Sequence, residues 1–517
     1  MTRIKILLFL LFVGIINAQN PVLVSDIRPG AAGSVEDWGT SSVQLGEKIF
    51  FIANNGTIKS GLYVMENNDV KLLKNLCIDC QLSSEMALFD GKVYFTASEN
   101  NKLSLWHTDG TESNTKFVTD INHFKIDNFF VADEYLYFTS NDNLYVINDM
   151  LGVKIISGIN AEFSTNGLDN LDYNKVCKYE NGIAHLTLKD DSILLYKITD
   201  THTLLGKYKI DNRFIDFHGL NVVSNGLVYV YDNEMYNWRK STGTIVKNSF
   251  SVGNKISRII PFKLNEPLVF VSSNGYYLLK GTATVTLTKF SSRWDNLSQN
   301  DEIPRTVHNE QMVFFADDFN SFNDYIISTD GTTSNTKEFV AESSHPSNFY
   351  NINQNCFFAT GIRNGFEPIL YNYDFDSKNL TEIKKFSQSS LQSNTIMILG
   401  VVGKRIFYLG NLDASVGREL YYIETDINTS TDDVNAIPSD SYFNINKSGE
   451  NLIVTNDQKS DERIHVSIHG MDGKLYQKFD SQTNLSFPIK ANSNVYVVMI
   501  SNESGQKVVS KIFIEQE

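Results

Sequence analysis

Proline, cysteine and tryptophan are scarce in this 517-residue chain, with 9, 4 and 4 copies. Long stretches of Ala, Glu, Lys and Leu with a 3.6-residue period are also missing, which argues against a helical architecture. Basic residues are in deficit, because 45 Lys and Arg stand against 60 Asp and Glu and give a net charge of −15. Since phosphate groups are neutralised by basic surfaces, this charge disfavours a nucleic-acid or anionic-membrane partner.

Apolar runs long enough to cross a bilayer are absent, so we expect no transmembrane span. The first residues, "MTRIKILLFLLFVGIINAQN", place Arg3 and Lys5 before a short apolar run that ends in small residues. This pattern predicts a signal peptide over residues 1–18, with cleavage between Ala18 and Gln19. A buried N-terminal helix is the alternative.

The four cysteines are Cys77, Cys80, Cys177 and Cys356. Cys77 and Cys80 have the spacing of a redox or metal half-site, but no second such pair and no nearby His completes a tetrahedral set. We therefore expect a Cys77–Cys80 disulfide or two free thiols. Cys356 lies in the apolar stretch "NCFFAT" and is predicted to belong to the core.

Catalytic motifs are missing too. The chain contains no Gly-x-Ser-x-Gly, no His-Glu-x-x-His and no phosphate-binding glycine loop. The acidic run at Asp317, Asp318 and Asp324 is interpreted as one solvated loop, because the acids of a glycosidase must converge across a cleft. We predict no catalytic residue, no cofactor and no metal ligand.

Aromatic residues, in contrast, make up 12% of the chain and recur with a period. A strand that is polar at its start and apolar at its end returns nine times, as in "GEKIFF", "DGKVYF" and "GKRIFY". Its last positions lie 40 to 50 residues apart, at Phe51, Phe95, Phe138, Leu186, Val230, Phe270, Phe315, Phe358 and Tyr408. The mean spacing of about 44.6 residues is the size of a four-stranded propeller blade.

The repeat therefore predicts an all-β fold, in which residues 19–427 form a closed β-propeller of about eight to nine four-stranded blades. Unit four, which begins at "NGIAHLTLKDD", is the least regular and the one whose status as a blade is most open. The last unit, residues 395–426, lacks a fourth strand, whereas residues 22–27 form a fourth strand without the first three. We expect residues 22–27 to complete that blade and close the ring.

Three segments carry a family resemblance: "GRELYYIETD" at 417–426, "LWHTDGTESNT" at 105–115 and "STDGTTSNT" at 328–336. They resemble the repeat proteins named for the pattern Glu-Leu-Trp-x-x-Asp-Gly-Thr, and "DIRPGAAGS" at 26–34 is similar to the linker that commonly follows this repeat. The motif residues Asp109, Gly110, Thr111, Asp330, Gly331 and Thr332 are interpreted as matching structural turns in units two and seven.

Trp106, in the first of these copies, is expected to fill space between blades. The alternative for Asp109 and Asp330 is calcium binding, although a lone Asp-Gly-Thr lacks the alternating oxygen ligands of a calcium loop.

A second domain follows a polar linker at residues 428–440. Residues 441–517 alternate apolar and polar positions and predict a small immunoglobulin-like β-sandwich. The segments "HVSIHGMDGKLYQKF" and "NVYVVMISNESGQKVVSKIFIEQ" resemble the C-terminal sorting domain of type IX secretion cargo. This resemblance implies a Gram-negative source and export through the periplasm to the outer-membrane surface or the medium.

The same resemblance implies that the partner of residues 441–517 is the type IX secretion machinery, with Lys507 and Lys511 on a readable strand edge. The alternative is a generic immunoglobulin-like appendage used for binding.

Two functions fit these observations. The first is a non-catalytic binding or adhesion protein for an extracellular glycan or protein, in which Trp38, Trp238 and Trp294 could stack on sugars or pack on a protein partner. The alternative is a polysaccharide hydrolase or lyase with carboxylates in the propeller channel. An acidic ligand is disfavoured in both cases by the charge of the chain.

Overall fold

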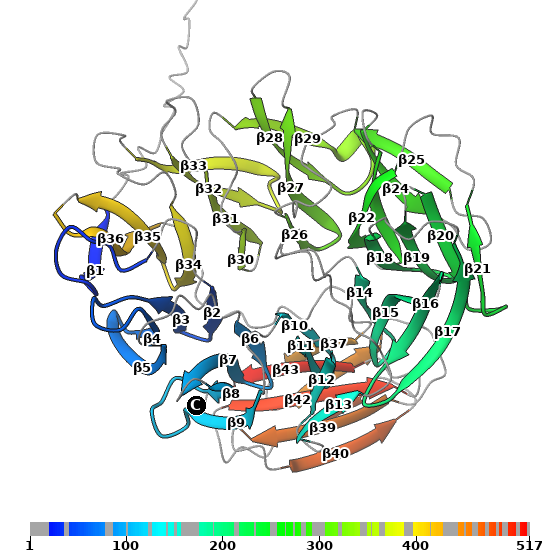
Figure 1. Cartoon of the computed structure of the whole chain (residues 1–517), viewed down its shortest axis with the longest axis horizontal. Helices are drawn as coiled ribbons and strands as arrows, with labels where there is room; N and C mark the ends of the chain where they lie inside the picture. Colours follow the sequence, from blue (N-terminus) through cyan, green and yellow to red (C-terminus); the bar gives the residue numbers. More distant parts are fainter. Residues whose placement is uncertain are drawn as a thin grey trace, which may run out of the picture.

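The computed structural model describes thirty segments of the chain and shows a ring of β-sheets (Figure 1). The described residues are 20–35, 41–77, 86–99, 102–121, 127–140, 143–148, 152–156, 175–189, 191–210, 217–231, 234–248, 256–263, 265–271, 275–280, 286–291, 305–318, 323–341, 349–352, 354–360, 368–386, 396–413, 415–425, 427, 443–448, 451–456, 464–470, 475–481, 485–488, 495–502 and 507–513. The predicted signal peptide, its cleavage site and the linker lie outside them.

Nine four-stranded antiparallel sheets follow one another around the ring as blades. The first strands of neighbouring blades lie side by side around the axis, and we call these nine strands the inner ring (Figure 1). They are β2 (Ser42–Leu45), β6 (Met86–Phe89), β10 (Asp127–Ala132), β14 (Val176–Tyr179), β18 (Phe217–Val223), β22 (Ile256–Lys263), β26 (Arg305–His308), β30 (Tyr350–Ile352) and β34 (Met397–Val402).

The second and third strands form the middle of each blade. The second strands are β3 (Lys48–Ala53), β7 (Lys92–Glu99), β11 (Tyr135–Ser140), β15 (Gly182–Lys189), β19 (Gly226–Tyr231), β23 (Glu266–Val271), β27 (Gln311–Asp318), β31 (Asn355–Ala359) and β35 (Arg405–Asp413). The third strands are β4 (Ser60–Glu66), β8 (Lys102–Thr108), β12 (Asn143–Asn148), β16 (Ser192–Ile198), β20 (Glu234–Arg239), β24 (Gly275–Lys280), β28 (Asn323–Thr329), β32 (Ile369–Asp374) and β36 (Gly417–Glu424).

The fourth strands form the outer edges of the blades. They are β5 (Asp69–Cys77), β9 (Lys116–Asp120), β13 (Gly152–Ile156), β17 (His202–Lys209), β21 (Thr244–Lys247), β25 (Thr286–Ser291), β29 (Lys337–Ala341), β33 (Asn379–Lys385) and, for the ninth blade, β1 (Val22–Ser25). The fold class predicted from the repeat is therefore confirmed, and the number of blades is nine.

The recurring second strand is apolar because each blade is covered on both faces by its neighbours. Between blades 1 and 2, Phe50 and Leu62 meet Val93 and Phe95 in one cluster, and all four side chains are fully buried. Full burial of each such side chain contributes about 1.5 to 3 kcal/mol. The period of about 44 residues is thus the number of residues from one interface between blades to the next.

Blade 4, whose regularity was in doubt, has the same four strands as the others. In its second strand, Leu186 stands where most other blades have an aromatic residue. Leu186 is fully buried beside Leu195, in the cluster that blade 4 shares with blade 5. The doubt was wrong because packing between blades requires an apolar side chain of sufficient volume at this position, and a leucine satisfies it.

The ring closes as predicted. The N-terminal strand β1 pairs antiparallel with β36, the third strand of the ninth blade, with Val22 opposite Tyr422, Leu23 opposite Tyr421 and Ser25 opposite Leu420. The register shifts between Leu23 and Ser25. Beyond β1, Ser34 N donates to the Arg418 carbonyl of β36 at 2.9 Å and adds to the closure.

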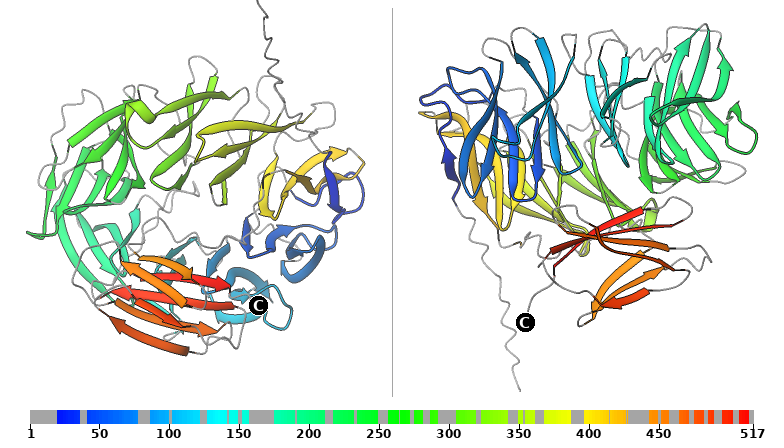
Figure 2. Two further views of the ribbon diagram at one scale, coloured as in Figure 1. Left: turned by 180° about the vertical axis from the view of Figure 1, so that it is seen from behind. Right: turned by 90° about the horizontal axis from the view of Figure 1, so that it is seen from below.

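The C-terminal strands form two further sheets (Figure 2). Strands β37 (Phe443–Ser448), β38 (Asn451–Asn456) and β41 (Leu485–Pro488) form the first sheet. The second sheet contains β39 (Ile464–Gly470), β40 (Leu475–Ser481), β42 (Val495–Asn502) and β43 (Lys507–Phe513), in the order β40-β39-β42-β43. Lys507 and Lys511 therefore lie on β43, the strand at one edge of this sheet.

Within the described ranges, no helix is long and apolar enough to span a membrane.

Candidate functional site

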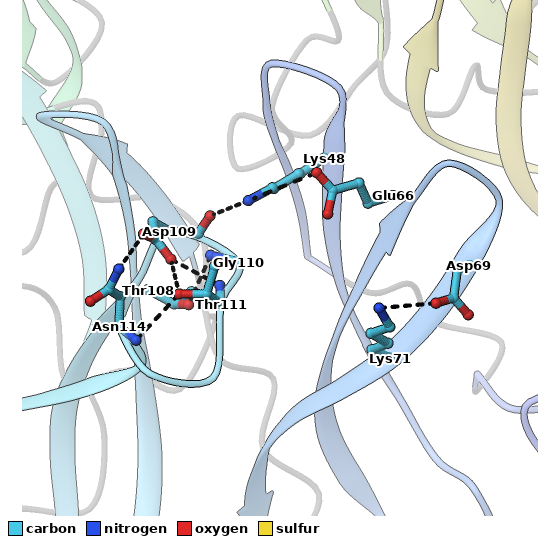
Figure 3. A network of polar contacts seen from close by, with 9 residues as sticks. All are labelled: Lys48, Glu66, Asp69, Lys71, Thr108, Asp109, Gly110, Thr111 and Asn114. Atoms are coloured by element: carbon cyan, nitrogen blue, oxygen red, sulfur yellow. Dashed lines mark hydrogen bonds and ion pairs between the residues drawn. The ribbon is translucent and has the colours of Figure 1, made fainter. Parts of the chain in front are cut away.

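The Asp-Gly-Thr segment of blade 2 is a turn whose polar groups bond to one another (Figure 3). Asp109 Oδ1 accepts hydrogen bonds from Thr111 N at 2.8 Å and Thr111 Oγ1 at 2.7 Å, while Oδ2 accepts one from Asn114 Nδ2 at 2.7 Å. Gly110 has a φ of 93° and donates its N–H to Thr108 Oγ1 at 3.0 Å. The Asp109 carboxylate therefore caps the backbone of the turn.

The Asp-Gly-Thr segment of blade 7 repeats this geometry. Asp330 Oδ1 accepts from Thr332 N at 2.9 Å and Thr332 Oγ1 at 2.6 Å, and Oδ2 accepts from Asn335 Nδ2 at 2.6 Å. Gly331 has a φ of 84°. Both motifs join the third and fourth strands of their blades, β8 to β9 in blade 2 and β28 to β29 in blade 7.

Each turn packs on the preceding blade. Lys48 of blade 1 donates from Nζ to the backbone oxygen of Asp109 at 2.9 Å (Figure 3). A Cβ added to Gly110 would lie 2.7 Å from Lys48 Cδ and 3.1 Å from Phe50 Cζ. In blade 7 the corresponding contact of Gly331 is with Leu278 and Phe262 of blade 6. The motif is therefore a contact between blades, which accounts for its glycine.

The electrostatics of both aspartates follow from these bonds. Partial burial raises the pKa of Asp109, but the hydrogen bonds from Thr111 and Asn114 and the charge of Lys48 outweigh it and hold the pKa below its ordinary value. The pKa of Asp330 is lowered in the same way. Calcium binding was the second interpretation of these aspartates. To bind the cation, their carboxylate oxygens would have to give up the hydrogen bonds that they accept within their own turns. Across the described segments, no group of three or more His, Cys, Asp or Glu side chains is placed to hold a metal ion.

Trp106 and Trp238 both lie between blades, although only Trp106 was predicted to do so. Trp106 contacts the cluster between blades 1 and 2 and lies under the Lys74 ammonium, 3.7 Å from its ring centroid, so it is the wedge that was expected. Trp238 is buried between blades 4 and 5 and donates from Nε1 to the Leu205 carbonyl at 3.0 Å. The prediction that Trp238 contacts a ligand is wrong. Although Trp238 lies near the end of its strand, the neighbouring blade covers its side chain. Trp38 and Trp294 lie outside the described residues.

The other candidate side chains are placed as follows. Cys77 ends β5, whereas Cys80 is outside the described residues, so the disulfide stays a prediction. Cys356 is fully buried between blades 7 and 8, as expected. Asp317 and Asp324 lie opposite each other on β27 and β28, so this acidic run belongs to paired strands and not to a loop.

The inner ring combines exposed apolar side chains with amides that link the blades. Leu88, Val131 and Val307 are 40%, 43% and 37% exposed on β6, β10 and β26. Asn351 donates from Nδ2 to the Val307 carbonyl in the neighbouring blade at 3.3 Å.

Gln44 makes the densest of these links. Its Nε2 donates to the Val401 carbonyl at 2.9 Å, and its Oε1 accepts from Val401 N at 3.1 Å and from Tyr350 Oη at 3.0 Å. No sequence pattern predicts this role, since a glutamine in a short strand is unremarkable without the register of the neighbouring blade.

Carboxylates are rare in the inner ring. Asp127 is the one Asp or Glu within its nine strands. The described carboxylate whose pKa is raised is Glu419, on β36, and it is fully buried. The single acid of the inner strands and the acid with the raised pKa therefore lie on different strands, β10 and β36.

A scan against protein-family models finds no match, and a search of curated proteins finds none. Among solved structures, the extracellular domain of a hybrid two-component system from B. thetaiotaomicron is 11% identical, with 94% of this chain and 76% of that chain covered and a TM-score of 0.30. PorZ, a surface component of the type IX secretion system of Porphyromonas gingivalis, is 10% identical over 92% of this chain and 81% of its own, with a TM-score of 0.25. The WD40 domain of SCAP from fission yeast is 9% identical over 78% and 98%, with a TM-score of 0.39. TM-scores this low carry no argument about this chain, whose all-β, nine-bladed propeller is defined by its own sheets.

Proposed function

We propose that this chain is a secreted, non-catalytic binding protein whose propeller presents its inner ring to an extracellular glycan or protein. The observation that carries the proposal is the composition of the inner ring. Its strands expose Leu88, Val131 and Val307 and contain a single carboxylate, Asp127. Exposed apolar side chains on a rigid scaffold favour recognition of a neutral ligand, whereas acid catalysis needs two carboxylates that converge on one bond.

The position of Glu419 supports binding over catalysis. Raised carboxyl pKa values are typical of catalytic acids, and a general acid must reach the bond that it protonates. Glu419 is fully buried, and its Oε2 accepts a hydrogen bond from Ile27 N at 3.0 Å. Its environment is therefore suited to a structural role.

The proposed address rests on sequence. The signal-like residues 1–18, the resemblance to Glu-Leu-Trp-x-x-Asp-Gly-Thr repeat proteins and the sorting-domain resemblance of residues 441–517 together favour export by a type IX system to the cell surface or the medium. The edge position of β43 supports this, since an unpaired strand edge can be recognised by strand addition. A generic binding appendage remains the alternative for this domain.

A glycan array and a pull-down with the full mature chain would test the function, with any bound glycan checked for cleavage products. We expect binding without cleavage. Leu88→Asp and Val131→Asp should reduce binding at least tenfold, because each places a charge on the inner ring. Leu72→Asp is the matched control, since Leu72 is 41% exposed but lies on the outer strand β5, and it should bind normally. Cleavage products would instead favour the hydrolase or lyase.

A further inference from the structure

The outer strand of blade 2 carries an exposed aromatic side chain beside an exposed lysine. Phe117 on β9 is 50% exposed, although it lies opposite Trp106 in register and packs edge to face on that ring, with 5.9 Å between the ring centroids. Lys116 precedes Phe117 on the same strand and is also exposed. The outer edge of this blade therefore presents one large apolar group and one cation to the solvent.

Phe117 and Lys116 point to opposite sides of the blade, because successive side chains of a strand alternate. Phe117 lies opposite Trp106, which contacts the cluster between blades 1 and 2, so Phe117 is on the side of blade 1. Lys116 lies opposite His107, whose ring contacts Tyr94 of the cluster between blades 2 and 3. The edge of blade 2 thus has an apolar side and a basic side.

The backbone of β9 is the edge of its sheet, since the described strands of blade 2 have the order β6-β7-β8-β9. The outward N–H and C=O groups of an edge strand can pair with a further strand. The turn that leads into β9 is held in place, because Asp109 accepts hydrogen bonds from Thr111 and Asn114. An edge that is already ordered loses little conformational entropy when a strand is added.

Blade 7 is an internal comparison, because it carries the same Asp-Gly-Thr turn. Glu338 of β29 occupies the register position of Phe117, and the residue before it is again a lysine, Lys337. Lys337 donates from Nζ to the Lys378 carbonyl of blade 8 at 2.8 Å, whereas no bond of the Lys116 ammonium is found within the described segments. The turn therefore does not require the exposed ring of Phe117.

We propose that the edge of β9 accepts an extended, acidic polypeptide segment of a partner as a fifth strand of blade 2. Apolar side chains of this segment pack on Phe117, and the alternate, acidic side chains pair with Lys116. This surface lies on the outside of the propeller, so it is independent of the binding proposed for the inner ring (Figure 1).

The charges around this edge favour an acidic segment. Lys116 lies on one side of the blade, and on the other side Lys74 Nζ of blade 1 lies 3.7 Å from the Trp106 ring centroid. Asp120 is the one acid of β9, and it accepts a hydrogen bond from Ser104 at 3.1 Å. A basic segment would meet like charge on both sides of the blade, so charge selects the occupant.

The shape of the edge favours an extended segment over a second copy of the chain or a flat membrane. The strand β9 has five residues and belongs to a convex rim, so a rigid ring or a flat surface would touch little beyond it (Figure 1). A stable interface between folded proteins uses about 20 to 30 residues a side. An extended segment can instead pair along the whole strand.

Fluorescence anisotropy of a labelled peptide of alternating Val and Glu, mixed with the full mature chain, tests the proposal. We expect this peptide to bind and the matching peptide of alternating Val and Lys not to bind at the same concentration. Phe117→Glu, which copies blade 7, should weaken binding at least tenfold. Lys116→Glu should weaken it similarly and should allow the Val-Lys peptide to bind, which a merely unfolded variant would not do.

Leu204→Glu is the matched control. Leu204 is 49% exposed on the outer strand β17, but a register shift places it on the same side of blade 4 as Lys207, so this edge lacks the alternation. The control should bind the Val-Glu peptide normally. In hydrogen exchange, the bound peptide should raise the protection of β9 and leave that of β29 unchanged.

Equal binding of the acidic and basic peptides, or binding that Phe117→Glu leaves unchanged, would overturn the proposal. So would peptide binding without added protection of β9. Binding to phosphatidylglycerol vesicles that Phe117→Glu abolishes would assign the edge to a lipid surface instead. A dimer seen in sedimentation that the same variant dissociates would assign it to a second copy of the chain.

Discussion

Gly110 and Gly91 both lie in blade 2 with positive φ, at 93° and 67°, yet they differ in what surrounds them. A Cβ on Gly91 would meet nothing within 4 Å, whereas one on Gly110 would lie 2.7 Å from Lys48 Cδ and 3.1 Å from Phe50 Cζ. Comparing Gly110→Ala with Gly91→Ala therefore separates the cost of backbone strain from the cost of the contact between blades.

Backbone strain alone should lower the free energy of unfolding by about 1 to 2 kcal/mol in each variant. Gly110→Ala carries a further cost. Phe50 is fully buried and cannot move, and displacing Lys48 sacrifices its 2.9 Å bond to the Asp109 carbonyl. Overpacking of this kind costs about 1 to 3 kcal/mol, so we expect a total of about 2 to 5 kcal/mol for Gly110→Ala.

Urea unfolding followed by tryptophan fluorescence would measure both variants, with the slope against urea checked for constancy. Truncating the lysine should recover part of the loss, so Gly110→Ala should cost less in a Lys48→Ala background than alone. Equal costs for Gly110→Ala and Gly91→Ala would refute the reasoning, since the turn could not then be packed on blade 1.

Three further outcomes are expected. Asp109→Ala, which removes three hydrogen bonds from an exposed turn, should cost about 1 to 2 kcal/mol in urea, against less than about 0.5 kcal/mol for Glu112→Ala in the same turn; equal losses would contradict the capping role. Gln44→Ala, which breaks the bonds between the inner strands of blades 1, 8 and 9, should cost about 2 to 3 kcal/mol and raise hydrogen exchange in β34; unchanged exchange there would argue against the link. Partial burial raises the pKa of Glu180, but hydrogen bonds and charges from two lysines outweigh burial and lower this pKa to about 2. Glu180→Gln should therefore lower the melting temperature at pH 7 and leave it unchanged near pH 2. Its stabilisation is present above the ordinary pKa of about 4.5 and is lost as the pH falls through about 2; a difference that persists at pH 2 would contradict this.

The number of blades was predictable because the repeated residues are the ones that become buried between blades. Each second strand is covered on both faces, so Phe51, Phe95 and Phe138 had to be large and apolar, and their spacing reports the layers directly. The same reasoning explains why closure by residues 22–27 could be predicted: an unpartnered fourth strand at one end of the chain matches a missing one at the other.

Contacts between blades were not predictable from the sequence. Lys48 bonds to Asp109 across 61 positions of the chain, and Trp238 donates to a carbonyl 33 positions away. Such contacts depend on how one sheet is rotated against the next, and neither periodicity nor motif spacing encodes that rotation. The error over Trp238 has this origin, since proximity to a strand end says nothing about which neighbouring blade covers it.

Comparison of equivalent positions within the one chain separates structure from special roles. Asp109 and Asp330 accept the same hydrogen bonds in two blades. Capping of the turn is therefore a structural need of each blade that retains the turn. Ser104 of blade 2 and Glu419 of blade 9 occupy equivalent positions of the repeat but differ in chemistry. Glu419 keeps the glutamate of the repeat pattern, whereas Ser104 departs from it and donates to Asp120 of the neighbouring strand. The first position of the pattern therefore tolerates different side chains, whereas the Asp-Gly-Thr turn keeps its bonds in both blades that retain it.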